Sequence, residues 1–224
     1  MKALTLSALL LVTSVALAQD KVMIQPKWEK GQKHSLKFEI LFEIGGMTAK
    51  MTGTAVHEAK AVSAEGTEAS MALEGAKLEV GGDDPGIPIT GYTLKYDEKG
   101  QIKSASGGVE GSDSVRTFLL TQCYLPQEAV AKDGTWKQVL PESKALEIGE
   151  RTVDGTYLGT EAVDGKDYHK FKVKVVEKGN SFTTDGTYWV DTLGQVKKLD
   201  VAYMNLPVPA AGGSANGTAK ASAG

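Results

Sequence analysis

Three histidines are the residues best suited to chemistry in this sequence, because a neutral imidazole can bind a metal ion or accept a proton. His34, His57 and His169 never stand two or four residues apart, the spacings at which one strand or one helical turn presents two ligands together. His34 and His169 both fall in the apolar phase of alternating segments, so a site could still assemble between strands. A packed or hydrogen-bonded histidine is the simpler interpretation, and we expect no metal site.

The sequence also lacks the short motifs of catalytic and nucleotide-binding centres. It contains no G-x-S-x-G segment, and its Gly165-Lys166 pair is followed by Asp167 rather than by the Ser or Thr of a P-loop. Glu39 and Glu43 share one face of a predicted strand, but strand rise separates them by about 13 Å, more than glycosidase carboxylates allow. We therefore expect no catalytic residue, no cofactor and a protein that is not an enzyme.

Cys123 is the only cysteine, so an internal disulfide cannot form. It lies in the apolar stretch 118–125, where a cysteine usually packs as a small hydrophobic residue. A disulfide between two copies of the chain, or a reactive thiol, is the alternative. No histidine or lysine cluster accompanies Cys123 in the sequence to lower its pKa.

One pattern favours ligand binding. Met47, Ala49 and Met51 share one face of a predicted strand, and Met71 lies in the next segment. Small side chains leave volume, and methionine adapts to irregular apolar partners, so this face could line a cavity together with Phe118. The alternative is a core that Phe118 and its neighbours fill completely. The candidate ligand-binding residues are Met47, Ala49, Met51, Met71 and Phe118.

The elements that would position these residues are mainly strands. In Lys33–Ile44 the even positions are apolar and most odd positions are charged, which is typical of a strand with one wet face. The apolar phase switches at Gly75, as a β-bulge requires. Alternation returns in residues 166–178, 181–191 and 195–203, and four Asp-Gly pairs, at Asp133, Asp154, Asp164 and Asp185, predict hairpins.

Residues 113–124 differ from the rest, because their apolar side chains follow helical spacing until Pro126 forbids continuation. We expect one short helix there, between two similar halves. The predicted fold is all-β and mainly antiparallel, with about ten strands curved into a half-barrel or incomplete barrel.

The two halves share a motif. Asp97 and Asp191 each begin the pattern D-x-x-G-Q-[IV]-K, which predicts a tight turn with glycine in the left-handed region. Each half also begins near a tryptophan, Trp28 or Trp136. An internal duplication explains the pattern, and so do two independent turns of common composition.

The two ends of the sequence differ in composition from the segments between them. Met1 to Ala18 combines Lys2, an apolar run and an A-x-A-like site, which predicts a cleavable signal peptide and export to the periplasm or beyond. No later stretch reaches transmembrane length. Residues 19–206 are predicted to form a single β domain. The tail, residues 207–224, is rich in Ala, Gly, Ser and Pro and is predicted to be disordered.

The formal net charge of −3 and the absence of a basic cluster interleaved with aromatic residues argue against nucleic-acid binding. Lys170, Lys172 and Lys174 alternate with apolar residues, so a solvated strand face explains them better than a headgroup or polysaccharide site.

A few short motifs, in their order along the chain, support a family resemblance. Trp28 opens W-E-K-G-Q before an alternating strand, residues 96–100 form the first turn, and Pro126, Trp136 and residues 188–194 follow. In this order the chain resembles secreted bacterial proteins of unknown function that share a lipoprotein-carrier-like β half-barrel. The resemblance implies a curved antiparallel sheet with a helix in its concavity, sometimes an apolar ligand cavity, and no catalytic residues.

We therefore expect a secreted, non-enzymatic protein that binds an apolar ligand, such as a lipid acyl chain, on the concave face of its sheet. A structural or protein-interaction component of the cell envelope is the alternative. A hydrolase with an unrecognised site is the least favoured interpretation.

Overall fold

The computed structural model describes residues 20–86, 89–107, 122–144, 148–179, 182–208 and 213–223. Within these residues, eleven strands form one antiparallel sheet, so the all-β prediction is confirmed. The strands are β1 (Lys33–Ile44), β2 (Met47–Ser63), β3 (Gly66–Val80), β4 (Tyr92–Tyr96), β5 (Ile102–Gly107), β6 (Thr135–Leu140), β7 (Arg151–Val163), β8 (Lys166–Glu177), β9 (Thr183–Val190), β10 (Val196–Val208) and β11 (Gly213–Ala223). The predicted signal peptide, Met1 to Ala18, lies outside the described residues.

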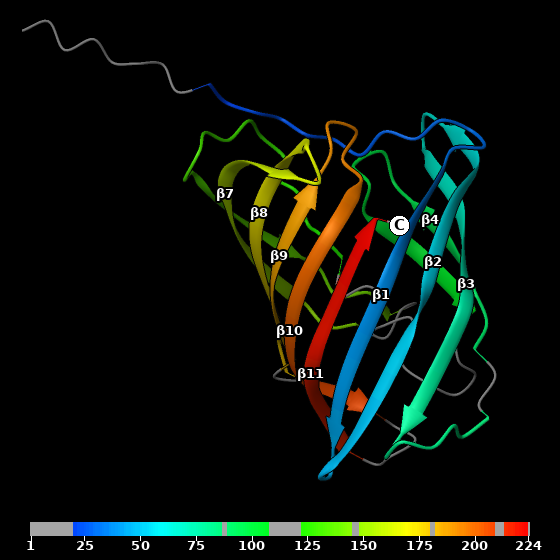
Figure 1. The fold of residues 1–224 in the computed structure, drawn as a ribbon. Coiled ribbons are helices and arrows are strands. Elements are labelled where there is room, and N and C mark those ends of the chain that lie inside the picture. Colours follow the sequence, from blue (N-terminus) through cyan, green and yellow to red (C-terminus); the bar gives the residue numbers. More distant parts are fainter. Residues whose placement is uncertain are drawn as a thin grey trace, which may run out of the picture.

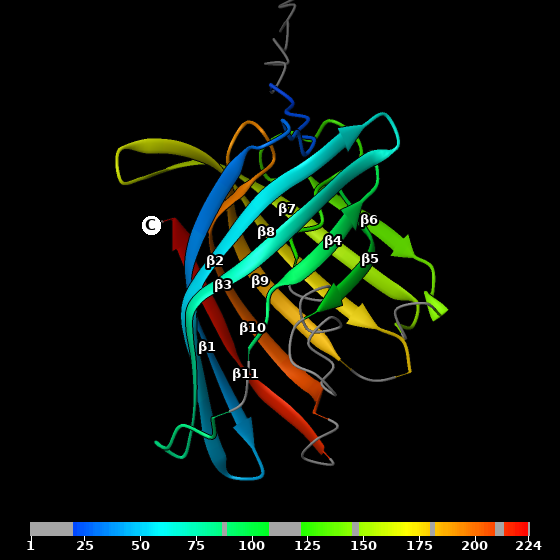
Figure 2. The same ribbon diagram turned by 90° about the vertical axis from the view of Figure 1, so that its right-hand side faces the viewer.

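The sheet consists of two meanders of five strands joined through β11. Its strand order is β5-β4-β3-β2-β1-β11-β10-β9-β8-β7-β6, so β5 and β6 stand at its two ends and it is not closed into a barrel. The sheet is strongly curved, and β11 runs between β1 and β10 in its middle (Figures 1 and 2). We call β1–β5 the first half, β6–β10 the second half, and the concave side of the sheet the inner face.

The alternation in β1 places its apolar residues on the inner face. Leu36, Phe38 and Ile40 lie opposite Ala55, Gly53 and Met51 of β2, in continuous register. The second half repeats this alternation, since the inner side chains of β8 from Phe171 to Glu177 are buried whereas Lys172 and Lys174 are exposed. The strand predicted from period-two spacing is therefore correct.

The predicted bulge is also confirmed. The register between β2 and β3 shifts between Thr52 and Thr54, and Gly75 has a φ of 59° in the left-handed region. An extra residue at this point rotates the rest of β3, so that its apolar residues keep facing inward on both sides of the bulge.

Only one of the four Asp-Gly pairs makes a hairpin between described strands, and the pair at Asp133 forms a turn that leads into β6. Asp164 and Gly165 form the β7–β8 turn, with φ values of 51° and 75°. Gly155 and Gly186, by contrast, lie within strands β7 and β9. Steric space explains why both positions are glycine. A Cβ on Gly155 would lie 2.1 Å from the Trp136 ring, and one on Gly186 would lie 2.7 Å from the ring of Tyr188.

The predicted disordered tail is wrong. β10 continues to Val208, and Gly213–Ala223 forms β11, which pairs with β1 on one side and β10 on the other. The small side chains that suggested disorder are required here, because Gly217 lies opposite both Phe42 and Tyr203. A Cβ on Gly217 would approach the Tyr203 hydroxyl to 2.6 Å. Large aromatic residues on the neighbouring strands thus take the space that a larger residue in β11 would need.

The predicted short helix falls mostly on residues 113–121, outside the described residues. Residues 122–124, its expected end, form an irregular segment. The part of the chain that the structure describes contains no helix long and apolar enough to cross a membrane.

Candidate functional site

The residues predicted to line a ligand cavity are brought together only in part. Ala49 and Met51 lie on the inner face of β2, opposite Phe42 and Ile40, and Met71 lies on β3 opposite His57. Ala49 and Met71 are buried, Met51 is half-buried, and Met47 beside the β1–β2 turn is 58% exposed. Phe118 lies outside the described residues. Met47 is thus too near the tip of its hairpin to line an interior site.

The inner face of the second half is filled. Phe171 and Val175 are completely buried, and Tyr188 is 1% exposed. They pack against Ile24 and Tyr124, which come from segments that cross the concavity, and against further apolar residues of the same cluster. This half has the close packing of an ordinary protein core.

The inner face of the first half is less completely covered. Phe38, Ile40 and Phe42 of β1 are half-buried, and so are Leu73 and Tyr92. Their neighbours on β2 and β11 are small, because Phe38 lies between Gly53 and Ala221. The large side chains of β1 therefore lie between neighbouring strands whose side chains are small.

One end of the concavity is crossed by residues 20–32, which we call the strap. Figure 1 shows this segment running over the top of the sheet from the second half to the first. The Lys27 amide donates to the Leu193 carbonyl at 2.9 Å, and the Gly31 amide donates to the Ala59 carbonyl at 2.8 Å. The strap thus ties the β9–β10 turn to β2.

The strap packs against the two repeated turns through Pro26. In each turn an aspartate Oδ1 accepts two backbone N–H bonds of 2.9 Å. The amides of Lys99 and Gln101 donate to Asp97, and those of Leu193 and Gln195 donate to Asp191. The glycines Gly100 and Gly194 have φ values of 74° and 76°. A Cβ on either glycine would lie within 2.7 Å of Pro26. The turns share one geometry, and each joins the fourth strand of its half to the fifth, in keeping with the duplication considered above.

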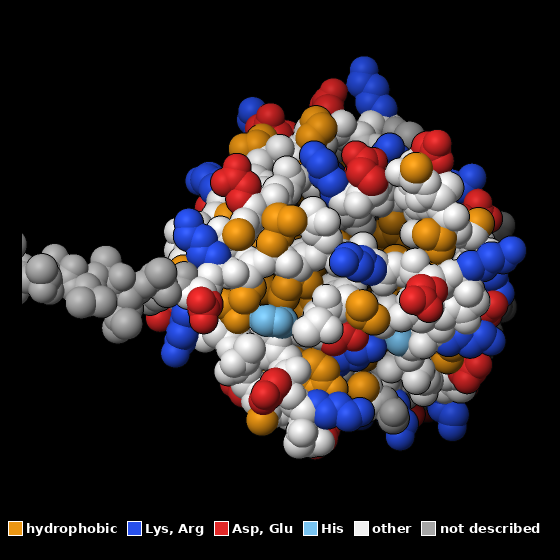
Figure 3. Space-filling model, turned by 90° about the horizontal axis from the view of Figure 1, so that it is seen from above, with side chains coloured by type: hydrophobic (Ala, Val, Ile, Leu, Met, Phe, Trp, Pro, Cys, Tyr) orange, Lys and Arg blue, Asp and Glu red, His pale blue; other side chains and the backbone are white. Residues whose placement is uncertain are grey.

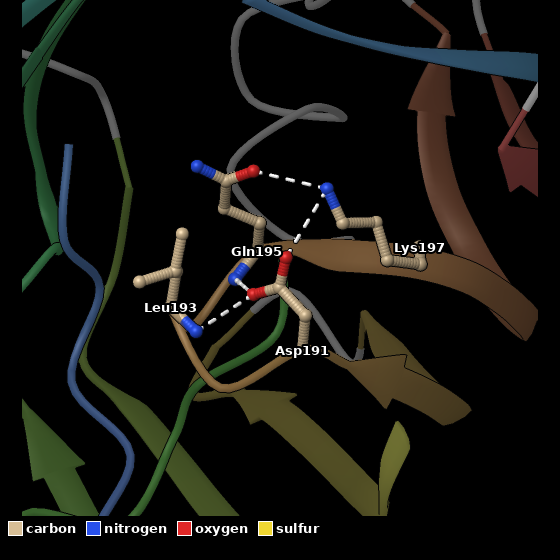
Figure 4. A network of polar contacts seen from close by, with 4 residues as sticks. All are labelled: Asp191, Leu193, Gln195 and Lys197. Atoms are coloured by element: carbon tan, nitrogen blue, oxygen red, sulfur yellow. Dashed lines mark hydrogen bonds and ion pairs between the residues drawn. The ribbon is translucent and has the colours of Figure 1, made fainter. Parts of the chain in front are cut away.

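The second turn also holds a polar network (Figure 4). Lys197 Nζ lies 3.2 Å from Asp191 Oδ2 and donates to Gln195 Oε1 at 3.0 Å, with about a fifth of each charged side chain exposed. Gln195 Nε2 is buried and has no hydrogen-bond partner. The ammonium group is close enough to His34 to lower the pKa of that imidazole, although burial is the larger cause.

His34 and His57 form a stacked pair beneath the strap. Their ring centroids are 4.6 Å apart, and Trp28 of the strap lies 5.2 Å from His34 and 6.3 Å from Tyr96. Burial lowers the pKa of His34 to about 4, and burial followed by the neighbouring His34 lowers that of His57 to about 3. Both imidazoles are therefore neutral near pH 7.

The histidine pairing differs from the one considered in the sequence. His34 meets His57 because the β1–β2 register places them opposite each other, whereas His169 lies beside Tyr157, its Nδ1 2.9 Å from the tyrosine hydroxyl. No spacing motif could have shown this, since the contact depends on the length of the hairpin. Among the described residues, no three His, Cys, Asp or Glu side chains gather into a group that could hold a metal ion.

Two pockets flank Pro26 at this end of the molecule. The larger, of about 420 Å³, is lined by Trp28, Tyr96, Thr67 and Leu193 among others. The smaller, of about 170 Å³, reaches Cys123 and Tyr124. Figure 3 shows this end from above, with hydrophobic side chains exposed between lysines and carboxylates. Of the four predicted ligand-binding residues that the structure describes, none lines either pocket.

Cys123 packs beside the second-half core, and burial raises the pKa of its thiol. A protonated thiol is a poor nucleophile, so its surroundings fit the packing role expected from the sequence. The site as a whole combines apolar surface, stacked rings and a paired lysine, which are groups suited to binding and orienting a ligand.

Comparison with known proteins adds little. No family model matches the sequence, and no curated protein matches it. One solved structure, the crystal structure of a DUF1329 family protein from Desulfovibrio piger ATCC 29098, has 10% sequence identity over 86% of this chain and 84% of that chain, with a TM-score of 0.26. A likeness at that TM-score supports no conclusion about function.

Proposed function

We propose that the chain is an exported, non-catalytic binding protein that holds an apolar ligand, such as a lipid acyl chain, against the inner face of the first half. The observation that carries this proposal is the unequal packing of the two halves. In the second half the inner side chains are covered by crossing segments, and Val153 and Phe171 are fully buried. In the first half Phe38 and Phe42 are only half-buried.

An acyl chain suits this surface physically. Each square ångström of apolar surface removed from water contributes about 25 cal/mol, so a ligand that covers half-buried aromatic and aliphatic side chains gains affinity without any polar contact. The Phe38 ring lies over Gly53, where an added Cβ would be 3.0 Å from Phe38 Cζ, and this half-buried ring offers an apolar contact to such a ligand. Met51, half-buried on the same face, can adapt its side chain to such a ligand.

The electrostatics support binding rather than catalysis. His34, His57 and Cys123 have shifted pKa values, and in each case burial is the largest cause. Burial of this kind keeps the groups neutral, whereas a general base or a nucleophilic thiol is usually activated by a charged partner. Export is supported by the signal-like segment Met1 to Ala18.

The test is extraction of the purified chain with organic solvent, together with native mass spectrometry. We expect a co-purifying lipid, and reduced retention of a long-chain lipid in Met51→Glu, which places a carboxylate on the inner face. Thr52→Glu is the matched control, because Thr52 is also half-buried but points to the other face. Equal retention by the two variants, or a chain that never retains lipid, would contradict the proposal.

A second candidate function is favoured by one observation. Among the strands that the structure describes, β6 is the last in the sheet order, and Val139 on it is 61% exposed. An exposed edge of this kind can accept a strand from a partner protein of the cell envelope. Val139→Lys should then weaken a cross-linked complex while leaving lipid retention unchanged.

A further inference from the structure

The larger pocket beside the strap, which we call the strap pocket, is built from four separate segments. Its wall includes Trp28 and Glu29 of the strap, Val62 at the end of β2, Asp97 of the β4–β5 turn and Leu193 of the β9–β10 turn. Its volume of about 420 Å³ is that of a site for a small molecule. No side chain assigned above to the acyl-binding surface lines it, so it is a separate site.

The strap is held in place on both sides of Trp28. Its backbone amides before and after this residue donate to carbonyl groups of the β9–β10 turn and of β2. Within the strap, the Glu29 amide also donates to Gln32 Oε1 at 2.9 Å. These bonds fix the wall of the pocket in the ligand-free protein, so that little conformational freedom is lost when a ligand binds.

Part of the pocket wall is apolar and accessible to solvent. Val62 and Leu193 are 43% and 41% exposed, which is unusual for large aliphatic side chains. Trp28 is half-buried, and its ring centroid lies 6.3 Å from that of Tyr96 with 30° between the ring planes. Aromatic rings attract organic cations through their quadrupole, and aliphatic side chains favour methyl groups over a hydrated ammonium.

The charged residues of the pocket wall are mainly acidic. Carboxylates are supplied by Glu29, Asp97 and Glu98, whereas Lys27 is the one cationic residue among the described lining residues. Within the part of the chain that the structure describes, no lysine or arginine forms an ion pair with these three carboxylates. The wall therefore favours a positively charged ligand.

The two equivalent turns differ in how their aspartates are neutralised. Asp191 Oδ2 lies 3.2 Å from Lys197 Nζ, and Asp191 does not line the strap pocket (Figure 4). The residue equivalent to Lys197 in the first turn is Lys103, which is exposed and is not paired with Asp97. The first turn thus places in the pocket wall an aspartate that lacks the ammonium partner of its counterpart.

We propose that the strap pocket binds a small, free organic cation that carries methyl groups, such as a trimethylammonium compound. The cation supplies to Asp97 the charge that Lys197 supplies to Asp191, and its methyl groups contact Trp28, Val62 and Leu193. Because the pocket shares no lining residue with the acyl-binding surface, this inference goes beyond the proposed function and does not rest on it.

The test is calorimetric titration of the purified chain with three probes. Choline carries both the charge and the methyl groups, its carbon isostere dimethylbutanol keeps the shape without the charge, and ethanolamine keeps a charge without the methyl groups. We expect choline to bind about tenfold more tightly than either of the other probes. A chain that does not bind choline, or that binds it no more tightly than either control probe, would overturn the proposal.

Two matched variants locate the site. Asp97→Asn keeps the oxygen that accepts the turn bonds but removes the charge, so it should weaken choline binding about fivefold and leave dimethylbutanol unaffected. Asp191→Asn makes the same change in the equivalent turn, outside the pocket, and should leave choline affinity unchanged. Equal losses in the two variants, or no loss in Asp97→Asn, would contradict binding in the strap pocket.

Phosphocholine distinguishes a free cation from a lipid headgroup, because it carries the same trimethylammonium group next to a phosphate. We expect it to bind more weakly than choline, since the carboxylates of Glu29 and Glu98 in the pocket wall repel the phosphate. Tighter binding of phosphocholine than of choline would indicate a headgroup site and would overturn the assignment to a free cation.

Discussion

His34 and His57 stack across the β1–β2 pair with ring centroids 4.6 Å apart, beneath the strap and close to Lys197. Burial and the neighbouring ammonium group make it unfavourable to add a proton to either imidazole. The folded protein therefore resists protonation of the pair, whereas the unfolded chain protonates both histidines freely.

This relationship predicts acid sensitivity. The folded pKa values of about 4 and 3 lie below the ordinary value of 6.5, so the unfolded state binds more protons as pH falls from 6.5 toward 4, and stability decreases. Most carboxylates titrate below this window. By pH 5 the loss from His34 alone is on the order of 2 kcal/mol, measurable by urea unfolding.

His34→Phe keeps a ring in the stack and should flatten the dependence on pH between 7 and 5. His169→Phe is the comparison, because His169 is less buried and lies beside the Tyr157 hydroxyl. If both variants show the slope of the unmodified chain, the buried pair is not the source.

Gly194→Ala should loosen the strap. A Cβ at this position would lie 2.7 Å from the Pro26 backbone, and the φ of 76° adds conformational strain. We expect a loss of about 2–4 kcal/mol and faster proteolysis within residues 20–32. Gly165→Ala is a matched control, since its φ is 75° and nothing lies within 4 Å of the new Cβ. It should cost about 1 kcal/mol, and an equal cost for both variants would argue against the contact with Pro26.

The two equivalent aspartates should differ in one respect. Asparagine keeps the side-chain oxygen that accepts the turn bonds, so Asp97→Asn should change the free energy of unfolding by less than about 0.5 kcal/mol. Asp191→Asn also removes the anionic partner of Lys197, 3.2 Å away and about four-fifths buried, and should cost about 1–2 kcal/mol. Chemical unfolding of both variants measures the difference. Equal effects would mean that the Lys197 pair contributes nothing.

Removal of residues 213–223 should abolish cooperative folding, because β11 provides the pairing on one side of both β1 and β10. Circular dichroism and sedimentation should show loss of the native sheet and aggregation through the two exposed edges. A synthetic peptide of the same residues should restore the sheet. A shortened chain that stays folded and monomeric without the peptide would contradict the central position of β11.

Period-two spacing and turn chemistry were sufficient to predict β1, the bulge at Gly75 and the two D-x-x-G-Q turns, because these depend on neighbours in sequence. The repeated aspartate and glycine positions predicted a tight turn at both places, each with glycine in the left-handed region. Strands with one dry face followed from the same alternation, whereas the curvature of the sheet was implied by the family resemblance.

Other features depend on contacts distant in sequence. β11 has almost no large side chains, and only its neighbours Phe38, Phe42 and Tyr203 explain why small ones are needed. Gly155 is likewise fixed by the Trp136 ring and not by a turn. The His34–His57 contact requires the register of a long hairpin, and the burial of Arg151 requires the whole second half.

The central place of β11 also sets an order of events during synthesis. Ten of the described strands precede Gly213–Ala223 along the chain, yet the backbone ladder that unites the two meanders cannot exist until that segment has been made. Each meander can form its local hairpins early, but their union waits on contacts of very high sequence separation, which form slowly. The nascent chain therefore stays incompletely folded for most of its synthesis, because β1 and β10 each lack β11 as a hydrogen-bonded neighbour until the end.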